Sequence, residues 1–181
     1  MCGIVGFVNE ETIENKNKNI KAMMDRIIHR GPNSSGQYVD DSVALGFRRL
    51  SIIDIEAGNQ PMYSPDGNVV LIFNGEIYNF LGLKEKLEEK GHTFLTHSDT
   101  EVLLHAYLEY GEKVVDHLRG MFGFAVWDKR EKKLFIARDH FGIKPVYYGG
   151  FGDTFMFASE IKAFLDNEKF VKELNKEALK P

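Results

Sequence analysis

The lone cysteine of this 181-residue chain is its second residue, Cys2. If Met1 is removed, Cys2 carries a thiol and a free α-amine, so one residue could supply both a nucleophile and its base. An α-amine has a reference pKa of about 7.7 to 8.0, which leaves a useful neutral fraction near pH 7 without a histidine partner. The alternative is that Cys2 packs as a small hydrophobe at the start of a strand.

A second candidate for chemistry is the pair Asn74-Gly75, which follows the apolar run 69–73. Attack on a carbonyl requires donors fixed where negative charge develops. The Asn74 side chain offers one donor, and a glycine lets its backbone N–H approach a substrate closely. Asn-Gly is also a common hairpin turn, but residues 76–79 are not typical of a returning strand. We expect Asn74 at a strand end, with Gly75 completing an oxyanion hole.

Three charged residues could hold the two ends of an amino acid. Arg49 could bind a carboxylate in bidentate fashion, although one member of the pair Arg48-Arg49 could instead be solvated. Glu76 and Asp99 could bind an ammonium group together, although an acid such as Asp99 also stabilises the first turn of a helix. An amino acid held in this way could present a side-chain amide to Cys2.

The elements that must position these residues are predicted from hydrophobic patterns. Helical spacing occurs over 20–28, 80–87 and 102–110, and the last helix is opened by the capping box of residues 98–101. Short apolar runs predict strands at 3–8, 43–47, 50–53, 69–73, 122–127, 133–137, 146–148 and 155–158. Since the helices fall between groups of strands, the pattern favours an α+β fold with largely antiparallel sheets.

Composition excludes several classes of protein. Hydrophobic residues make up 43% and charged residues 28%, as in an ordinary globular domain, and the net charge of −4 argues against nucleic-acid binding. No long apolar run or leader peptide is evident, so we expect no membrane association and a cytoplasmic location. One cysteine and scattered histidines predict no metal site. We expect one domain over residues 1–166, with the charged residues 167–181 beginning a linker.

Eight segments of the chain together resemble the class II glutamine amidotransferase domain, an N-terminal-nucleophile hydrolase, and in particular that of glutamine-hydrolysing asparagine synthetases. The segments are CGIVG at 2–6, HRGPNSSG at 29–36, RRLSIID at 48–54, FNGEIYN at 73–79, HSDTE at 97–101, GMFGFAVWD at 120–128, RDHFGIKPVYY at 138–148 and FASEIKA at 157–163. The resemblance implies a four-layer αββα sandwich, with two mainly antiparallel sheets between helical layers.

The same resemblance implies a role for each candidate residue. Cys2 would be nucleophile and base, and Asn74 with the Gly75 N–H would form the oxyanion hole. Arg49 would bind the carboxylate of L-glutamine, and Glu76 with Asp99 would bind its amine. The glutamine pocket would also be lined by Leu50, Ser51, Ile52 and Ile53.

The activity implied is hydrolysis of the glutamine side-chain amide to glutamate and ammonia through a thioester. Ammonia would serve ATP-dependent asparagine synthesis from aspartate in a C-terminal synthetase domain. No SGGxDS-type loop occurs here, so we expect no cofactor in this domain, with ATP and Mg confined to the synthetase domain. Two alternatives remain open: another nitrogen acceptor, as in amidophosphoribosyltransferase or hexosamine-phosphate synthases, and a non-catalytic glutamine-binding module if Met1 is retained. Assembly into a homodimer is also left open.

Overall fold

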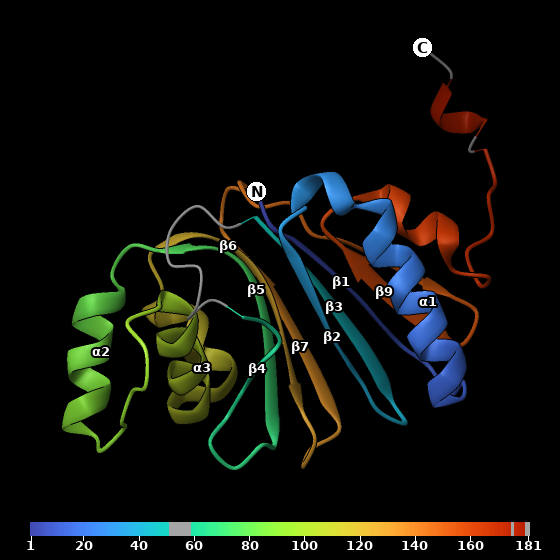
Figure 1. The fold of residues 1–181 in the computed structure, drawn as a ribbon. Helices are drawn as coiled ribbons and strands as arrows, with labels where there is room; N and C mark the ends of the chain where they lie inside the picture. Colours follow the sequence, from blue (N-terminus) through green and yellow to red (C-terminus); the bar gives the residue numbers. More distant parts are fainter. Residues whose placement is uncertain (51–58, 175, 180–181) are drawn as a thin grey trace.

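The computed structural model describes residues 1–50, 59–174 and 176–179 as two sheets packed face to face between helices (Figure 1). The five-stranded sheet has the order β2 (Ser34–Val39), β3 (Val43–Arg49), β1 (Gly3–Val8), β9 (Thr154–Ala158) and β8 (Tyr147–Phe151). The four-stranded sheet has the order β4 (Met62–Tyr63), β5 (Val69–Ile77), β6 (Gly120–Asp128) and β7 (Lys133–Arg138). All neighbouring strands are antiparallel.

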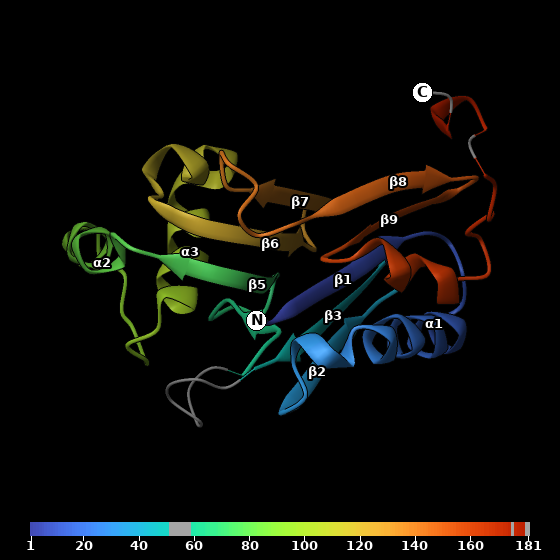
Figure 2. The same cartoon turned by 90° about the horizontal axis from the view of Figure 1, so that it is seen from above.

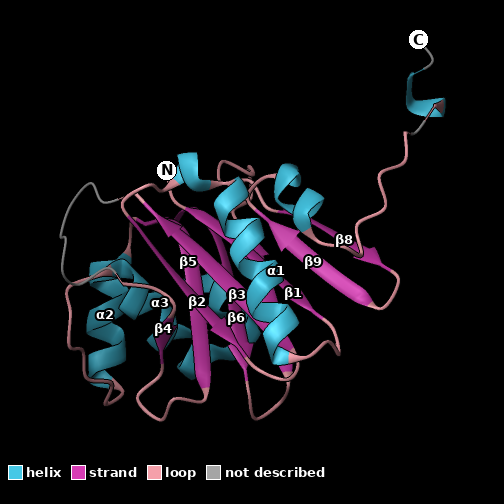
Figure 3. Ribbon diagram, turned by 45° about the vertical axis from the view of Figure 1, so that its right-hand side comes forward, coloured by secondary structure: helices cyan, strands magenta, loops and turns pink. Residues whose placement is uncertain are grey.

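The helices form the two outer layers, as the view from above shows (Figure 2). The five-stranded sheet is covered by α1 (Ile13–Arg26) and the 3-10 helix η3 (Ile161–Asp166). Figure 3 shows α1 lying across β1, β2 and β3. The four-stranded sheet is covered by α2 (Phe80–Glu89) and α3 (Asp99–Tyr110). Three further 3-10 helices are η1 (Ile28–Arg30), η2 (Gly111–His117) and η4 (Glu177–Leu179). The predicted four-layer α+β sandwich is therefore confirmed.

The continuous apolar runs of the central strands follow from burial on both faces. In β5, Val70 and Ile72 join the apolar cluster between the sheets, whereas Leu71 and Phe73 join the cluster beneath α2 and α3. Successive side chains of a strand point to opposite faces of the sheet. When both faces are covered, every position is buried, and the strand is apolar throughout instead of alternating between apolar and polar residues. The same alternation fixes which polar side chains enter the layer between the sheets.

The largest differences from the predicted boundaries are at the end of β5 and at the start of α1. β5 does not end before Asn74 but continues to Ile77, because residues 74–77 stay paired with β6. α1 begins at Ile13, seven residues before the predicted start, since the Thr12 hydroxyl caps it by accepting from the Asn15 N–H at 3.3 Å. The first half of α1 was not predicted, because the residues between Ile13 and Ile20 are polar and show no helical spacing of apolar residues. Most of the predicted strand 50–53 lies outside the described residues.

Candidate active site

Cys2, Arg49 and Asn74 point into the layer between the two sheets. Each is two residues from a member of the apolar cluster in that layer, and side chains two apart on a strand share a face. The neighbours in question are Ile4, Phe47 and Ile72. Cys2 itself packs against this cluster. The amino terminus lies at the end of the sandwich where β5 continues into α2 (Figure 1), so the three side chains enter the layer at one end.

The Cys2 sulfur is held by the residue that follows β3. The Leu50 N–H donates to Cys2 Sγ at 3.4 Å, and Sγ lies 3.8 Å from the Leu50 carbonyl oxygen. The structure thus brings Leu50 against the predicted nucleophile, whereas Ser51, Ile52 and Ile53 lie outside the described residues. The half-buried Cys2 is therefore fixed by backbone contacts as well as by apolar packing.

The side chain of Asn74 carries a buried amide donor. Its side chain is 3% exposed, and Nδ2 has no hydrogen-bond partner within the described part of the chain. A buried amide without a partner costs free energy of about 1–3 kcal/mol. Since such groups are rare in folded proteins, an unsatisfied donor facing the layer that holds Cys2 is a strong candidate for binding a substrate oxygen.

The Gly75 N–H points to the open edge of β5, away from β6. Phe73 N donates to Gln60 Oε1 at 2.6 Å on this edge, and Ile77 N donates to Asp99 Oδ2 at 2.9 Å. Backbone N–H groups two residues apart on a strand point the same way. The Gly75 N–H therefore lies between these two hydrogen bonds on the same edge of β5. It is one residue along the strand from Asn74, whose side chain carries the buried amide donor.

Glycine at position 75 is required by the approach of β6. A Cβ there would lie 2.3 Å from the carbonyl oxygen of Met121 and 2.7 Å from the Cα of Phe122. Asn74 and Gly75 pair in register with Gly123 and Phe122, so the alternative of an Asn-Gly turn is wrong. The pair lies inside a strand, where both donors are held by the sheet.

The two neighbouring arginines have different places. The Arg48 side chain points to α1, where Nε donates to the Met24 carbonyl oxygen at 3.0 Å and the guanidinium pairs with Asp25. Arg49 is 7% exposed and lies on the face that holds the other candidate site residues. The alternative of a solvated arginine therefore applies to neither residue.

Glu76 and Asp99, the two predicted ligands of an ammonium group, lie near the end of β5 and at the start of α3. Burial raises the pKa of Asp99 and the nearby charge of Glu76 raises it further, while N–H groups of Ile77 and Thr100 oppose the shift. Asp99 Oδ2 accepts from the Ile77 N–H at 2.9 Å, so Asp99 lies beside the residue that follows Glu76 in β5. Two adjacent carboxylates are stabilised by a bound cation, and this arrangement suits an ammonium group.

The start of α3 positions Asp99. As predicted, the Ser98 hydroxyl caps the helix by accepting from the Glu101 N–H at 3.2 Å. The reciprocal half of the predicted capping box is absent from the described contacts, because the Glu101 carboxylate accepts from the N–H groups of Leu95 at 2.8 Å and Thr96 at 2.7 Å. Glu101 thus holds the preceding loop and leaves Asp99 directed at β5.

Arg30 and Glu160 contact this site but were given no role from the sequence. Arg30 is 9% exposed; its Nε donates to the Cys2 carbonyl oxygen at 3.0 Å and its Nη1 donates to Glu160 Oε1 at 3.1 Å. Both residues belong to segments that carry the resemblance. Their contact spans 130 residues, and no spacing pattern in one sequence indicates it.

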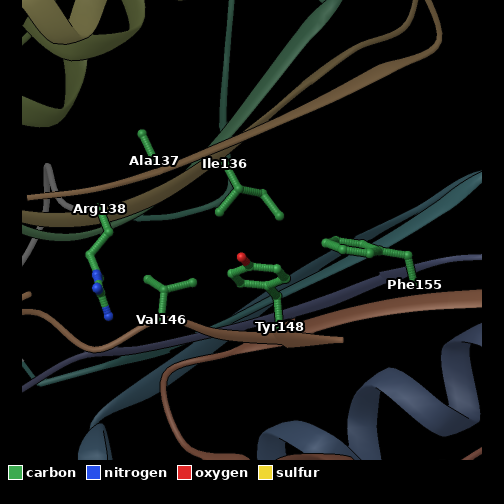
Figure 4. A pocket seen from close by; sticks show the side chains of 6 residues that line it. All are labelled: Ile136, Ala137, Arg138, Val146, Tyr148 and Phe155. Carbon is green, nitrogen blue, oxygen red and sulfur yellow. The ribbon is translucent and has the colours of Figure 1, made fainter. Parts of the chain in front are cut away.

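A separate apolar pocket of about 400 Å³ lies between the edge strands β7 and β8 (Figure 4). It is lined by Ile136, Ala137, Arg138, Val146, Tyr148 and Phe155. None of the predicted site residues lines it. In the described residues, no group of three or more histidine, cysteine, aspartate or glutamate side chains could hold a metal ion. No helix there is both long and apolar enough to cross a membrane.

Comparison with known proteins identifies the family. A family model described as a glutamine amidotransferase domain matches residues 1–181. The chain is 49% identical to asparagine synthetase [glutamine-hydrolyzing] 1 of Bacillus subtilis (strain 168), with 99% of this chain and 29% of that protein covered. It is 44% identical to asparagine synthetase [glutamine-hydrolyzing] of Zea mays, with 94% and 29% covered. The chain thus spans less than a third of the length of these relatives.

The fold is shared with a solved glutamine phosphoribosylpyrophosphate amidotransferase from B. subtilis, complexed with ADP and GMP. The TM-score is 0.71 at 25% identity, and the match covers 90% of this chain and 43% of that one. The resemblance inferred from the eight segments is confirmed by these matches. The chain belongs to the glutamine amidotransferase domain family.

Proposed function

We propose that the chain, once Met1 is removed, hydrolyses the side-chain amide of L-glutamine to glutamate and ammonia with Cys2 as the nucleophile. The observation that carries this proposal is the buried Asn74 amide nitrogen, which lies in the layer that holds the Cys2 sulfur and has no hydrogen-bond partner in residues 1–50, 59–174 and 176–179. The neighbouring Gly75 N–H supplies a second donor. Two donors beside a nucleophile suit the tetrahedral intermediate of acyl transfer.

Binding would place glutamine by its charged ends. The Arg49 guanidinium takes the α-carboxylate, and Glu76 with Asp99 takes the α-ammonium group. Because the α-carboxylate and the α-ammonium group of glutamine are both bound, the side-chain amide is positioned at Cys2. The attack of the sulfur then takes place within one complex and needs no further encounter. The bound ammonium also relieves the repulsion between the two carboxylates.

In the first half of the reaction, the free α-amine of Cys2 accepts the thiol proton, and Sγ bonds to the amide carbon of glutamine. Asn74 Nδ2 and the Gly75 N–H stabilise the oxyanion. The carbon–nitrogen bond then breaks, and the leaving nitrogen takes the proton from the amine to depart as ammonia. A γ-glutamyl thioester remains on Cys2.

In the second half, the same α-amine accepts a proton from water while the water oxygen attacks the thioester carbon. The same two donors stabilise the second oxyanion. The carbon–sulfur bond then breaks, and the proton returns to the sulfur as glutamate leaves. These steps consume one glutamine and one water and return the enzyme unchanged.

We further propose that the ammonia serves ATP-dependent asparagine synthesis from aspartate in a C-terminal synthetase domain of the parent polypeptide. Relatives named as asparagine synthetases are more than three times as long as the part of them that this chain matches. ATP and Mg would bind only in that domain, and this domain would use no cofactor. A cytoplasmic location fits a catalytic thiol, which a reducing compartment preserves. A homodimer is the proposed assembly.

The sequence predicts a domain over residues 1–166 and a linker from residue 167. The Phe170 ring packs on Phe151 and Phe164, with centroids 4.9 and 6.0 Å apart. This packing favours a linker start a few residues later. Val171 and Leu174 are exposed beyond it.

Two alternatives have specific support. A different nitrogen acceptor is favoured only by the structural match to the phosphoribosylpyrophosphate enzyme at 25% identity, against 49% for an asparagine synthetase. A non-catalytic glutamine-binding module follows if Met1 stays attached, since the Cys2 nitrogen is then part of an amide. The test is glutamate release from glutamine by chain whose Cys2 terminus is verified by intact mass. Absence of turnover in that material contradicts the proposal.

A further inference from the structure

We propose that Glu160 is a positioning residue that fixes the nucleophile by holding Arg30 against the Cys2 carbonyl. The proposal rests on the proposed function of Cys2. The Arg30 guanidinium donates through a different nitrogen to each partner. Nε donates to the Cys2 carbonyl oxygen at 3.0 Å, and Nη1 donates to Glu160 Oε1 at 3.1 Å. We call these three groups the Arg30 clamp.

A nucleophile at a chain end has a particular need for such a clamp. Terminal residues fray unless they are tied down, and once Met1 is removed no preceding residue holds Cys2. Catalytic groups must stay within about 0.5 Å of their productive position. Leu50 contacts the Cys2 sulfur, whereas the Arg30 hydrogen bond to the carbonyl oxygen anchors the Cys2 backbone.

Glu160 is itself locked to β1. Its neighbour Ser159 is fully buried and forms hydrogen bonds with both the N–H and the carbonyl group of Ile4. The Ile4 N–H donates to Ser159 Oγ at 3.0 Å, and the Ser159 N–H donates to the Ile4 carbonyl oxygen at 2.8 Å. The turn after β9 therefore carries Glu160 at a fixed distance from the start of β1.

The carboxylate of Glu160 is kept ionised. Burial by itself raises the pKa of Glu160, but hydrogen bonds from His29, Arg30 and Lys162 outweigh it and lower the pKa to about 2. His29 Nε2 lies 2.9 Å from Oε1, and Lys162 Nζ lies 3.2 Å from Oε2. The clamp therefore holds its charge at every pH at which the domain would work.

A matched control lies on the same side of the five-stranded sheet. Asp166, in η3, binds Arg26 of α1 through two hydrogen bonds of 2.5 and 2.7 Å. This ion pair also joins the segment after β9 to the α1 region, but it contacts neither Cys2 nor Ile4 among the described contacts. Asp166→Ala therefore removes an ion pair between the same two parts of the fold without touching the clamp.

The kinetic test uses the chain with Met1 removed. Glu160→Ala should lower kcat for glutamine hydrolysis by about tenfold or more, with KM within about twofold, because the clamp holds the nucleophile and not the substrate. Glu160→Gln keeps an acceptor for Arg30 and should restore most of the loss. Asp166→Ala should leave both parameters within about twofold. An unchanged kcat in Glu160→Ala, or a rise in KM alone, overturns the proposal.

Two further measurements show that Glu160 acts through Arg30. In an Arg30→Lys background, Glu160→Ala should cost less than about threefold in kcat, because paired effects on one contact are not additive. Amide hydrogen exchange at Gly3 and Ile4 should be faster in Glu160→Ala than in Asp166→Ala, with α3 as the internal reference. Equal exchange in the two variants refutes the clamp. If exchange differs but the unsubstituted chain hydrolyses no glutamine, the proposed function fails while the clamp stands.

Discussion

The backbone N–H of Leu50 donates to the Cys2 sulfur across 3.4 Å, which ties the first residues of the chain to one that is 48 positions away. The contact follows from the register of β1 and β3, in which Gly3 lies opposite Arg48. Any change that shifts this register also moves the sulfur. The pairing of strands in the five-stranded sheet thus determines where the sulfur of the nucleophile lies.

Cys2→Ala should abolish glutamine hydrolysis without unfolding the domain. Loss of a nucleophile reduces turnover by about 10³-fold or more, whereas the half-buried Cys2 side chain contributes little to the core. Glutamate release and thermal melting measure the two effects. Glutamate release at the unsubstituted rate by Cys2→Ala would exclude Cys2 as the nucleophile.

Activity should follow the fraction of chains that lack Met1. With Met1 in place, the Cys2 nitrogen is an amide and cannot act as a base. Treatment with methionine aminopeptidase should raise turnover in proportion to the processed fraction, as measured by intact mass. A sample that retains Met1 and is fully active disproves the amine as base.

Asn74→Ala should lower kcat by about 10²–10³-fold, the usual effect of losing one oxyanion donor. It should not lower stability, because the Asn74 amide nitrogen donates to no acceptor among the residues that the structure describes. The matched control is Asn79→Ala, since Asn79 donates to the His117 carbonyl oxygen at 2.9 Å and accepts from the Arg119 N–H at 2.8 Å. Asn79→Ala should cost about 1–2 kcal/mol of stability. The prediction fails if Asn74→Ala instead melts earlier and keeps its kcat.

Asp99→Asn should raise KM for glutamine while leaving the fold as stable or more stable. Losing a charged hydrogen bond to the ammonium group costs about 1.5–3 kcal/mol of binding free energy. The pKa of Asp99 is raised in the folded state, so the folded state binds this proton more tightly than the unfolded state. Ionised Asp99 therefore opposes folding above that pKa, and the cost disappears as pH falls through it. The side-chain amide of the Asp99→Asn variant keeps an acceptor oxygen for the Ile77 N–H.

Glutamine KM should also rise in acid, as Asp99 is protonated, and this rise should be absent from Asp99→Asn. Measurement of KM against pH for both proteins, with chemical denaturation at two pH values, checks binding and stability separately. A KM that is equal in the two proteins at neutral pH contradicts the role of Asp99.

Two glycine-to-alanine variants should have opposite effects on stability. In Gly75→Ala the new Cβ meets the Met121 carbonyl oxygen at 2.3 Å, so β5 and β6 must move apart. Overpacking of this kind costs about 1–3 kcal/mol. Gly82 lies in α2, and beyond its own stretch of helix no atom of the described residues comes within 4 Å of an added Cβ, so Gly82→Ala should stabilise by about 0.5–1 kcal/mol. Urea unfolding of both variants tests the contrast, and a stable Gly75→Ala protein would disprove the close approach.

Patterns that act over a few residues determined much of what the sequence alone could predict. Apolar runs located the central strands, and the Ser98 cap located the start of α3. Burial and capping both require particular residue types at positions close together in the sequence, so a local pattern predicts them. The place of Cys2 behind Met1 indicated its chemistry for the same reason: thiol and amine belong to one residue. The combination of segments that carries the resemblance identified the family.

Tertiary structure alone decided where β5 ends and what holds the nucleophile. Asn74-Gly75 resembles a turn in isolation, but pairing with β6 over nine residues of β5 keeps the pair in the strand. The Asn74 side chain then enters the layer between the sheets, and the Gly75 N–H lies at the open edge of β5. The Arg30 contacts with Cys2 and Glu160 likewise join residues 28 and 130 positions apart. Such contacts depend on how whole sheets and helices pack, so no local pattern encodes them.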